Sequence, residues 1–294
     1  MDAHLKKLVR RANDAQATGQ FAWLERTARE IIDLASAQND TATLSSGYRS
    51  LGTARHYASD AEGARAAYTR ALEIAESNDH AFEAALAMVA LGNMALEQHS
   101  DKDEGLRLHL LAEPVVRASG NLKQIGILTG NLSEIARIDG DYDRALAYAR
   151  ESLEALRAAG DEHREGWQLT NIALIHALTR NHLRTLEALR TAWQTLSATP
   201  NAYWNAMYFD VCFLVAVNME RWEIAAQLDG FTAQYRVDQR VPRLLGLMNA
   251  WYPPAVERFA RSLNADRIGE LRQTGANLSP PEAHRLALKL FTST

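Results

Sequence analysis

One nearly constant spacing limits what this chain can fold into. Apolar residues of the kind found in protein cores recur 40, 41, 40 and 40 residues apart, at Leu51, Leu91, Leu132, Ile172 and Cys212. Thirteen or fourteen residues after each stands a small residue, namely Ala64, Gly105, Ala145, Thr185 and Ala225. A fixed period of this length is typical of a solenoid, in which each repeat packs on the next. We therefore expect one elongated repeat domain, and a solenoid is more often a surface for partners than a scaffold for catalysis.

Each repeat contains two helical patterns joined by a turn. Apolar residues recur at i, i+3/i+4 and i+7, as at Ala67, Ala71 and Ile74. Residues that favour turns mark the joints within repeats, at Ser59-Asp60, Ser100-Asp101, Gly140-Asp141, Arg180-Asn181 and Glu220-Arg221. Similar residues separate the repeats, at Ser77-Asn78-Asp79, Ser119-Gly120-Asn121, Ala159-Gly160-Asp161 and Thr199-Pro200-Asn201. The pattern predicts an all-α protein of helix–turn–helix units.

Small residues recur beside the key positions, and we expect them where helices cross closely. Gly52, Gly92, Ser133 and Ala173 follow the key residues directly. A small side chain at a crossing lets two helix backbones approach each other. The recurrence at fixed offsets distinguishes this pattern from that of a generic helical protein.

The two ends of the chain depart from the period. Residues 1–38 resemble a degenerate first repeat, with its turn at Gly19 and a basic first helix over about residues 4–18. Residues 39–238 hold five repeats. Residues 239–294 break the period, and Ser279-Pro280-Pro281-Glu282 predicts a capping box that opens a final helix to about Leu290. We expect this tail to cap the open end of the solenoid.

The repeat resembles the tetratricopeptide repeat (TPR) in a longer form of about 40 residues. The residues that match its motif in the second and fourth units are Leu51-Gly52, Ala64, Tyr68 and Ala71, and Leu132, Gly140-Asp141-Tyr142 and Ala145. HEAT repeats have a similar period but lack this motif. The resemblance implies an all-α, right-handed superhelical solenoid of TPR-like units with a C-terminal helical cap.

Two C-terminal segments extend the resemblance. Residues 225–231, AAQLDGF, and residues 276–283, ANLSPPEA, are similar to segments that close the TPR region of large bacterial ATP-binding (STAND/LuxR-type) transcriptional regulators. Thr185, Cys212 and Ala149 depart from the usual Ala, Leu and aromatic residues. No nucleotide-binding module is present in this sequence. The resemblance therefore implies a stand-alone relative or the C-terminal piece of a longer regulator.

Bulk properties argue against several classes of partner. The net charge is −4 and the pI about 6.2, without a run of basic residues, so we expect no direct nucleic-acid binding. No apolar run is long enough for a membrane span, and the N-terminus lacks the apolar region of a signal peptide. Cys212 is the only cysteine and cannot form an intrachain disulfide, which favours a cytoplasmic protein. We interpret it as a small core residue.

No catalytic or cofactor motif stands out. The chain lacks the G-x-x-x-x-G-K-[ST] loop that surrounds phosphates. Its nine histidines include no H-E-x-x-H pair that would place two imidazoles on one helical face. We therefore expect no enzyme activity, no metal site and no cofactor.

The resemblance implies that the first helix of each repeat lines a concave groove that binds a protein or peptide. The polar and aromatic positions expected to face this groove are Arg49, Thr53, His56, Tyr57, Asn93, Glu97, Asn131, Glu134, Arg137, Asn171, Asp210 and Asn218. Asparagine suits this role because its amide both donates and accepts hydrogen bonds. The alternative is a structural role, with Glu134 and Arg137 as a local i,i+3 pair and the asparagines bonded to neighbouring helices.

Several functions remain open at this stage. The first is a scaffold or regulatory domain for a peptide or protein, including an intramolecular ATP-binding module in a longer regulator. The alternative is a small-molecule effector sensor. The aromatic residues Tyr203, Trp204, Tyr208 and Phe209 are candidates for either a binding hot spot or core packing. Homodimerisation through residues 1–20 and 239–294 is also open.

Overall fold

A computed structural model describes residues 2–98, 101–198, 201–241 and 252–291, without the side chains of residues 97 and 98. These residues form fifteen α-helices and a short 3-10 helix, and no strand occurs among them. Successive helices pack on one another, which confirms an all-α helical-repeat fold. The chain divides into two compact units, residues 1–131 and 132–294.

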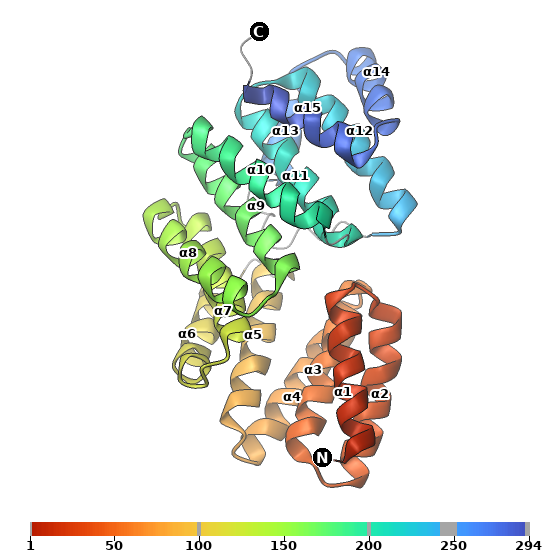
Figure 1. The fold of residues 1–294 in the computed structure, drawn as a ribbon, viewed down its shortest axis with the longest axis vertical. Coiled ribbons are helices and arrows are strands. Elements are labelled where there is room, and N and C mark those ends of the chain that lie inside the picture. The colour runs from red at the N-terminus through yellow and green to blue at the C-terminus, as the bar shows by residue number, and fades with distance from the viewer. Residues whose placement is uncertain (1, 99–100, 199–200, 242–251, 292–294) are drawn as a thin grey trace. The chain divides into compact units, whose positions relative to one another are not determined.

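The first unit begins with six helices in chain order (Figure 1). They are α1 (Ala3–Ala17), α2 (Phe21–Ala37), α3 (Thr41–Tyr57), α4 (Ala61–Ser77), α5 (Ala81–Gln98) and α6 (Lys102–Ala118). Helix α7 (Leu122–Ile138) passes from the first unit into the second. The second unit continues with α8 (Tyr142–Ala158), α9 (Glu162–Leu178), α10 (His182–Ala198), α11 (Ala202–Asn218), α12 (Trp222–Gln239), α13 (Tyr252–Ala260), α14 (Ala265–Ala276) and α15 (Pro280–Leu288), followed by the 3-10 helix Lys289–Phe291.

The 40-residue period is built from two nearly equal halves. Nine of the first twelve helices have 17 residues, and three residues separate two successive helices of these twelve wherever the structure describes the whole turn between them. One residue of each described turn has a positive φ, and these residues lie about 20 apart, at Gly19, Asn39, Ser59, Asp79, Gly120, Gly140, Gly160, Arg180, Glu220 and Arg240. A left-handed residue after the last helical turn ends a helix and reverses the chain. The expected turns at Ser100 and Thr199-Pro200 lie outside the described residues.

At several turns the last residue before the next helix caps that helix with its side chain. In α3, α4, α6, α8 and α9 this cap is an aspartate whose carboxylate accepts a hydrogen bond from a backbone N–H of the first turn. The cap satisfies an N–H that has no partner within the helix and places a negative charge at the positive end of the helix dipole. The chain thus ends one helix and starts the next within three residues.

Small residues stand where the two helices of a repeat cross, as the sequence predicts. A Cβ atom on Gly52 would lie 2.5 Å from the Tyr68 ring, and one on Gly92 would lie 2.7 Å from the His109 ring. Ala64, Ala145 and Ala225 are fully buried. The glycines therefore make room for a large side chain of the partner helix.

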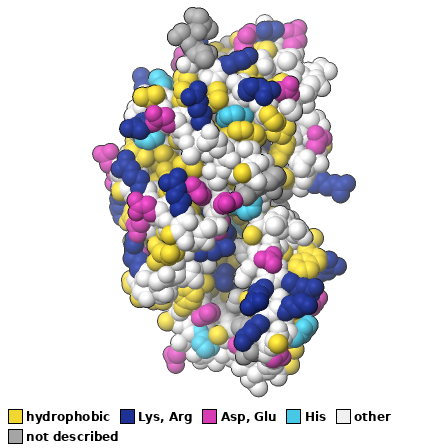
Figure 2. Space-filling view, viewed as in Figure 1, with side chains coloured by type: hydrophobic (Ala, Val, Ile, Leu, Met, Phe, Trp, Pro, Cys, Tyr) yellow, Lys and Arg dark blue, Asp and Glu magenta, His cyan; other side chains and the backbone are white. Residues whose placement is uncertain are grey.

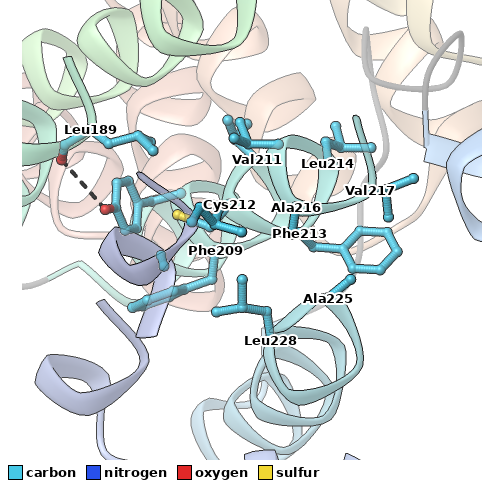
Figure 3. Close-up of a cluster of buried hydrophobic side chains, with 14 of the residues drawn as sticks. Leu189, Phe209, Val211, Cys212, Phe213, Leu214, Ala216, Val217, Ala225 and Leu228 are labelled. Carbon is cyan, nitrogen blue, oxygen red and sulfur yellow. Dashed lines mark hydrogen bonds between the residues drawn. The ribbon is translucent and has the colours of Figure 1, made fainter. Parts of the chain in front are cut away.

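The second unit has a large hydrophobic core in which α11 is central. Helix α11 is buried on nearly all sides, and residues 205–217 are all buried. Figure 3 shows Phe209, Cys212 and Phe213 of this helix among side chains from α10 and α12, with a hydrogen bond from Tyr208 to the Leu189 carbonyl. A helix that is apolar all round requires cover on every face.

The C-terminal helices supply part of this cover. Helices α13, α14 and α15 pack against α11 and α12. The closest approach joins α12 to α14, where a Cβ atom on Gly230 would overlap the carbonyl of Arg272 and one on Gly275 would overlap the carbonyl of Gln227. Helix α15 begins with the expected capping box, in which the Ser279 N–H donates to the Glu282 carboxylate.

A histidine fastens α15 to the preceding helices. His284 is 9% exposed, its Nδ1 lies 2.7 Å from the Tyr208 hydroxyl, and its ring stacks on Trp193. Burial, with the nearby charges of Arg190 and Arg285, lowers the pKa of His284 to about 4. The imidazole is therefore neutral in the folded protein. Because the Tyr208 hydroxyl donates to the Leu189 carbonyl, the Nδ1–H of His284 donates to the Tyr208 oxygen.

Among the described residues, no helix is both long and apolar enough to cross a membrane.

The left-handed turns give a first prediction, on stability. No atom would meet a Cβ on Gly160, so Gly160→Ala tests backbone strain without a steric clash. We expect it to lower the free energy of unfolding by about 1 kcal/mol, because a non-glycine residue is strained in the left-handed region. Arg180 already has a positive φ, so Arg180→Gly is expected to raise stability by roughly 0.5 kcal/mol. Urea denaturation measures both, and equal stabilities would contradict the strain argument.

The second prediction concerns pH. Between pH 6.5 and about 4 the unfolded chain binds a proton at His284 that the folded chain excludes, so the stability from this group is complete above pH 6.5 and falls as the pH drops towards 4. We expect a loss of about 1–2 kcal/mol between pH 7 and pH 5 from this group. His284→Gln should flatten the slope of unfolding free energy against pH. An unchanged slope would show that His284 titrates normally.

Candidate functional site

The residues predicted to face a groove all lie on the first helix of a repeat. In the first unit they are Arg49, Thr53, His56, Tyr57, Asn93 and Asn131. In the second unit they are Glu134, Arg137, Asn171, Asp210 and Asn218. The side chain of Glu97 lies outside the described residues.

The side chains on α3 mainly contact the neighbouring helices. The Tyr68 hydroxyl of α4 donates to Thr53 Oγ1 over 3.2 Å. The Tyr57 ring stacks on Phe21 of α2, with 4.0 Å between the ring centroids, and His56 meets Tyr57 edge-on. His56 and Tyr57 remain partly exposed, so their outer edges are accessible.

Arg49 is the cation of this region of α3. It is partly exposed at the residue level, but its surroundings lower the pKa of the guanidinium through desolvation. Tyr68 and Glu83 act in the opposite direction. An arginine stays charged in a protein, so a positive charge sits here at neutral pH.

A buried histidine joins two of the predicted asparagines in the first unit. His109 of α6 is 0% exposed, and its Nδ1 lies 2.6 Å from the Gly105 carbonyl oxygen. Its Nε2 lies 3.2 Å from Asn131 Nδ2 and 3.0 Å from Asn93 Oδ1. Burial lowers the pKa of His109, so the ring is neutral. Nδ1–H then donates to the carbonyl, and Nε2 accepts from Asn131.

The same geometry leaves Asn93 poorly satisfied at this ring. A neutral imidazole with its proton on Nδ1 has one lone pair, on Nε2. That lone pair faces the Asn93 oxygen, which is also an acceptor. Asn93 and Asn131 are both partly exposed. The first unit therefore presents two amides, one anchored by the histidine and one with an electrostatic reason to rotate.

The charged pair on α7 is almost completely buried. Glu134 is 7% exposed and accepts a hydrogen bond from Trp167 Nε1 on α9 over 3.1 Å. Arg137 is 1% exposed, and its Nε donates to Asn171 Oδ1 on α9 over 3.1 Å. Asn171 in turn donates to Ser133 Oγ over 3.3 Å. These contacts join successive repeats of the second unit.

The residues on α11 have similar roles. Asp210 is 0% exposed and forms an ion pair with Arg236 of α12, itself 6% exposed. Asn218 donates from Nδ2 to the Ala177 carbonyl oxygen of α9 over 2.7 Å. Asn218 is therefore bonded to a neighbouring helix, which agrees with a structural role for this asparagine.

The aromatic residues at the start of α11 divide into two groups. Tyr208 and Phe209 are 0% exposed and belong to the core. Tyr203 and Trp204 are partly exposed, and the Trp204 ring lies 5.8 Å from the ring of Trp167. This pair joins the first helices of two successive repeats. The half-exposed tryptophans give the second unit an apolar surface beside the buried Glu134.

Sequence reasoning did not single out His109 or Trp167. His109 lies on the second helix of its repeat, and its partners are 16 and 22 residues away. Trp167 lies 33 residues from Glu134. Nothing in the sequence around a half-buried tryptophan indicates its distant partner. A histidine on an apolar helix face is a weak sign of a buried polar contact.

Reactive chemistry is not evident in the described part of the chain. Cys212 is 0% exposed and is a core residue, as expected. Burial raises the pKa of its thiol to about 12, so the thiol stays protonated at neutral pH. The described residues contain no group of three His, Cys, Asp or Glu side chains placed to hold a metal ion.

Comparisons with known proteins support the fold. No family model matches the sequence. No curated protein matches it either. Twenty-one chains of solved structures match the fold. One is the crystal structure of BtubC (BKLC) from P. vanneervenii, with a TM-score of 0.54 and 16% identity, covering 76% of this chain and 92% of BtubC. At this identity the likeness shows a shared helical architecture alone.

Two asparagines at equivalent positions give a matched prediction. Asn171→Ala removes the acceptor of the buried Arg137 Nε and the donor to Ser133, so we expect it to lower the free energy of unfolding by about 2 kcal/mol. Asn131→Ala removes one bond to a neutral ring at a partly exposed site and should cost less than about 1 kcal/mol. Urea denaturation compares them. A reversed order would contradict the structural role of Asn171.

Proposed function

We propose that this protein is a TPR-like interaction module that binds an extended peptide or protein segment along the first helices of its repeats. The observation that most supports it is the pair of partly exposed amides of Asn93 and Asn131 on either side of the buried His109. Adjacent first helices present these amides, and each amide offers both a donor and an acceptor. A peptide backbone has the same alternation of donors and acceptors.

The histidine gives this pair its binding chemistry. It fixes Asn131 with the amide N–H directed at the ring, so the Asn131 oxygen is the group left for a ligand. Asn93 gains by turning its oxygen away from the Nε2 lone pair, and a ligand N–H is a partner for that oxygen. Both amides then accept from a bound segment while His109 remains neutral.

In the second unit, the side chains that remain exposed determine which residues a ligand can contact. Glu134, Arg137 and Asp210 are too buried to meet a partner without disrupting the repeats. The partly exposed rings of Tyr203, Trp204 and Trp167 are the accessible large groups there. Aromatic side chains contribute strongly to interfaces because they bury a large area at low entropic cost. We infer that this surface takes an apolar residue of a bound segment.

The sequence resemblance supports a regulatory setting for such a module. In a longer bacterial transcriptional regulator, the bound segment would belong to the ATP-binding module of the same chain. We propose a cytoplasmic location on the same ground, with the lone cysteine Cys212 in agreement.

The prediction is tested with a random array of 15-residue peptides probed by the purified protein. Peptides retained by the protein should bind the variant Asn93→Ala/Asn131→Ala at least tenfold more weakly, because two backbone hydrogen bonds are lost. Asn13→Ala on the exposed side of α1 is a matched control and should bind normally. Fluorescence anisotropy with the retained peptides measures the affinities.

Charge reversal at Glu134 or Arg137 is a poor test of binding, because either change leaves a buried charge and destabilises the fold. Equal affinity of the double asparagine variant would contradict the assignment to the first unit. A metabolite that raises the melting temperature saturably, with no peptide retained, would favour an effector sensor.

A further inference from the structure

The most basic surface in a single helix of the chain lies on α1, outside the residues of the proposed peptide site. Helix α1 contains four Lys or Arg residues, at Lys6, Lys7, Arg10 and Arg11, and Asp14 is its only acidic residue. All four basic side chains are exposed. In Figure 2, side chains of Lys and Arg gather over the region that α1 occupies in Figure 1.

Helical geometry separates this basic face from an apolar one. At 100° per residue, the four basic residues fall within about two fifths of the helix circumference. The opposite face contains Leu5, Leu8, Ala12 and Ala15, which are buried in a cluster with α2. The apolar face of α1 is therefore already covered, and only the basic face is free for a partner.

Within the described part of the chain, none of the basic residues of α1 has the carboxylate partner that several exposed arginines on other helices have. Several exposed arginines on other helices pair with a carboxylate three or four residues away, as in Arg29–Glu25, Arg70–Glu73, Arg107–Glu104, Arg117–Glu113 and Arg184–Glu187. Lys6, Lys7, Arg10 and Arg11 form no ion pair with any described residue. Their i,i+4 neighbours, Lys6–Arg10 and Lys7–Arg11, are like charges, which destabilise a helix.

Lys6 and Lys7 are the fourth and fifth residues of α1, past most of its first turn, so the helix dipole acts on them only weakly. An arrangement that lowers the stability of its own helix points to a role outside folding. Arg11 also lies 5.7 Å from the Trp23 ring centroid on α2, so a partly exposed indole borders the basic face.

We propose that the basic face of α1 is a second docking surface, and that its occupant is a short acidic segment of a partner protein. The four cations span about 7.5 Å along the helix axis, which matches three or four residues of an extended chain. Opposite charge draws the segment to the patch, and Trp23 offers an apolar contact at its border. This surface goes beyond the proposed peptide site and does not depend on it.

Two observations favour a short acidic segment over other polyanions. Nucleic acid and anionic membranes extend well past a patch of this length, and beyond α1 they would meet a chain whose net charge is −4. A membrane-binding amphipathic helix also inserts its apolar face, and the apolar face of α1 is buried in the first unit.

The test uses the full chain and a fluorescein-labelled hexaglutamate peptide at 50 mM salt, read by fluorescence anisotropy. We expect saturable binding that weakens as the salt concentration rises, because screening reduces the attraction. Lys7→Glu/Arg11→Glu should weaken binding at least tenfold, and Lys7→Gln/Arg11→Gln should fall between it and the wild type. The control Arg65→Glu/Arg150→Glu changes net charge equally on other exposed helix faces and should bind within twofold of the wild type.

Stability provides an independent readout. Lys7→Glu alone creates a favourable i,i+4 pair with Arg11, so it should raise the melting temperature while weakening hexaglutamate binding. The Asn93→Ala/Asn131→Ala variant should bind hexaglutamate normally, which separates this surface from the peptide site. Equal loss in the Arg65→Glu/Arg150→Glu control would overturn the proposal. Tighter binding to a twelve-residue oligothymidine or to phosphatidylserine vesicles than to hexaglutamate would also overturn it.

Discussion

The turn that ends each helix is the constraint on which the rest of the structure depends. A left-handed residue recurs at these turns about every 20 residues in the described repeats, and at several of them an aspartate follows that caps the next helix. Each residue added to or removed from a turn would rotate the next helix by about 100° about its axis. Ala64 and Gly105 would then leave the crossings where only a small side chain fits. The constant turn length therefore determines which side chains meet between helices.

Polar contacts between repeats add selectivity to this regular packing. Buried pairs such as Asp210–Arg236 contribute little net stability, since desolvation offsets most of the attraction. Mispairing is costly, however, because a buried charge without its partner destabilises a structure strongly. The partners differ from one junction to the next, with Arg137 bonded to Asn171 and Asn218 bonded to a backbone carbonyl. We infer that these differences help each repeat to recognise its own neighbour among similar repeats.

Local features of the fold could be predicted from the sequence, and long-range partners could not. The turns, the aspartate caps and the capping box at Ser279 depend on residues within a few positions of each other, so their signals are visible in a short window. The crossing of Gly230 and Gly275 joins residues 45 positions apart and has no such signal. The family resemblance predicts that Arg137 faces a groove. In the structure its guanidinium is buried against the next repeat, where it donates to Asn171, and no local pattern in the sequence marks that partner.

The two proposed surfaces differ in charge, and therefore in how strongly their binding depends on salt. Within the repeats, several exposed arginines are paired with carboxylates, and the amides of Asn93 and Asn131 are neutral. Hydrogen bonds from neutral amides depend little on ionic strength, whereas attraction to the unpaired cations of α1 falls as salt screens it. Two occupants bound to one molecule would therefore respond differently to salt. A partner with an acidic segment beside an extended one would engage both surfaces, and the second contact would form at a high effective concentration wherever the connecting chain spans the distance.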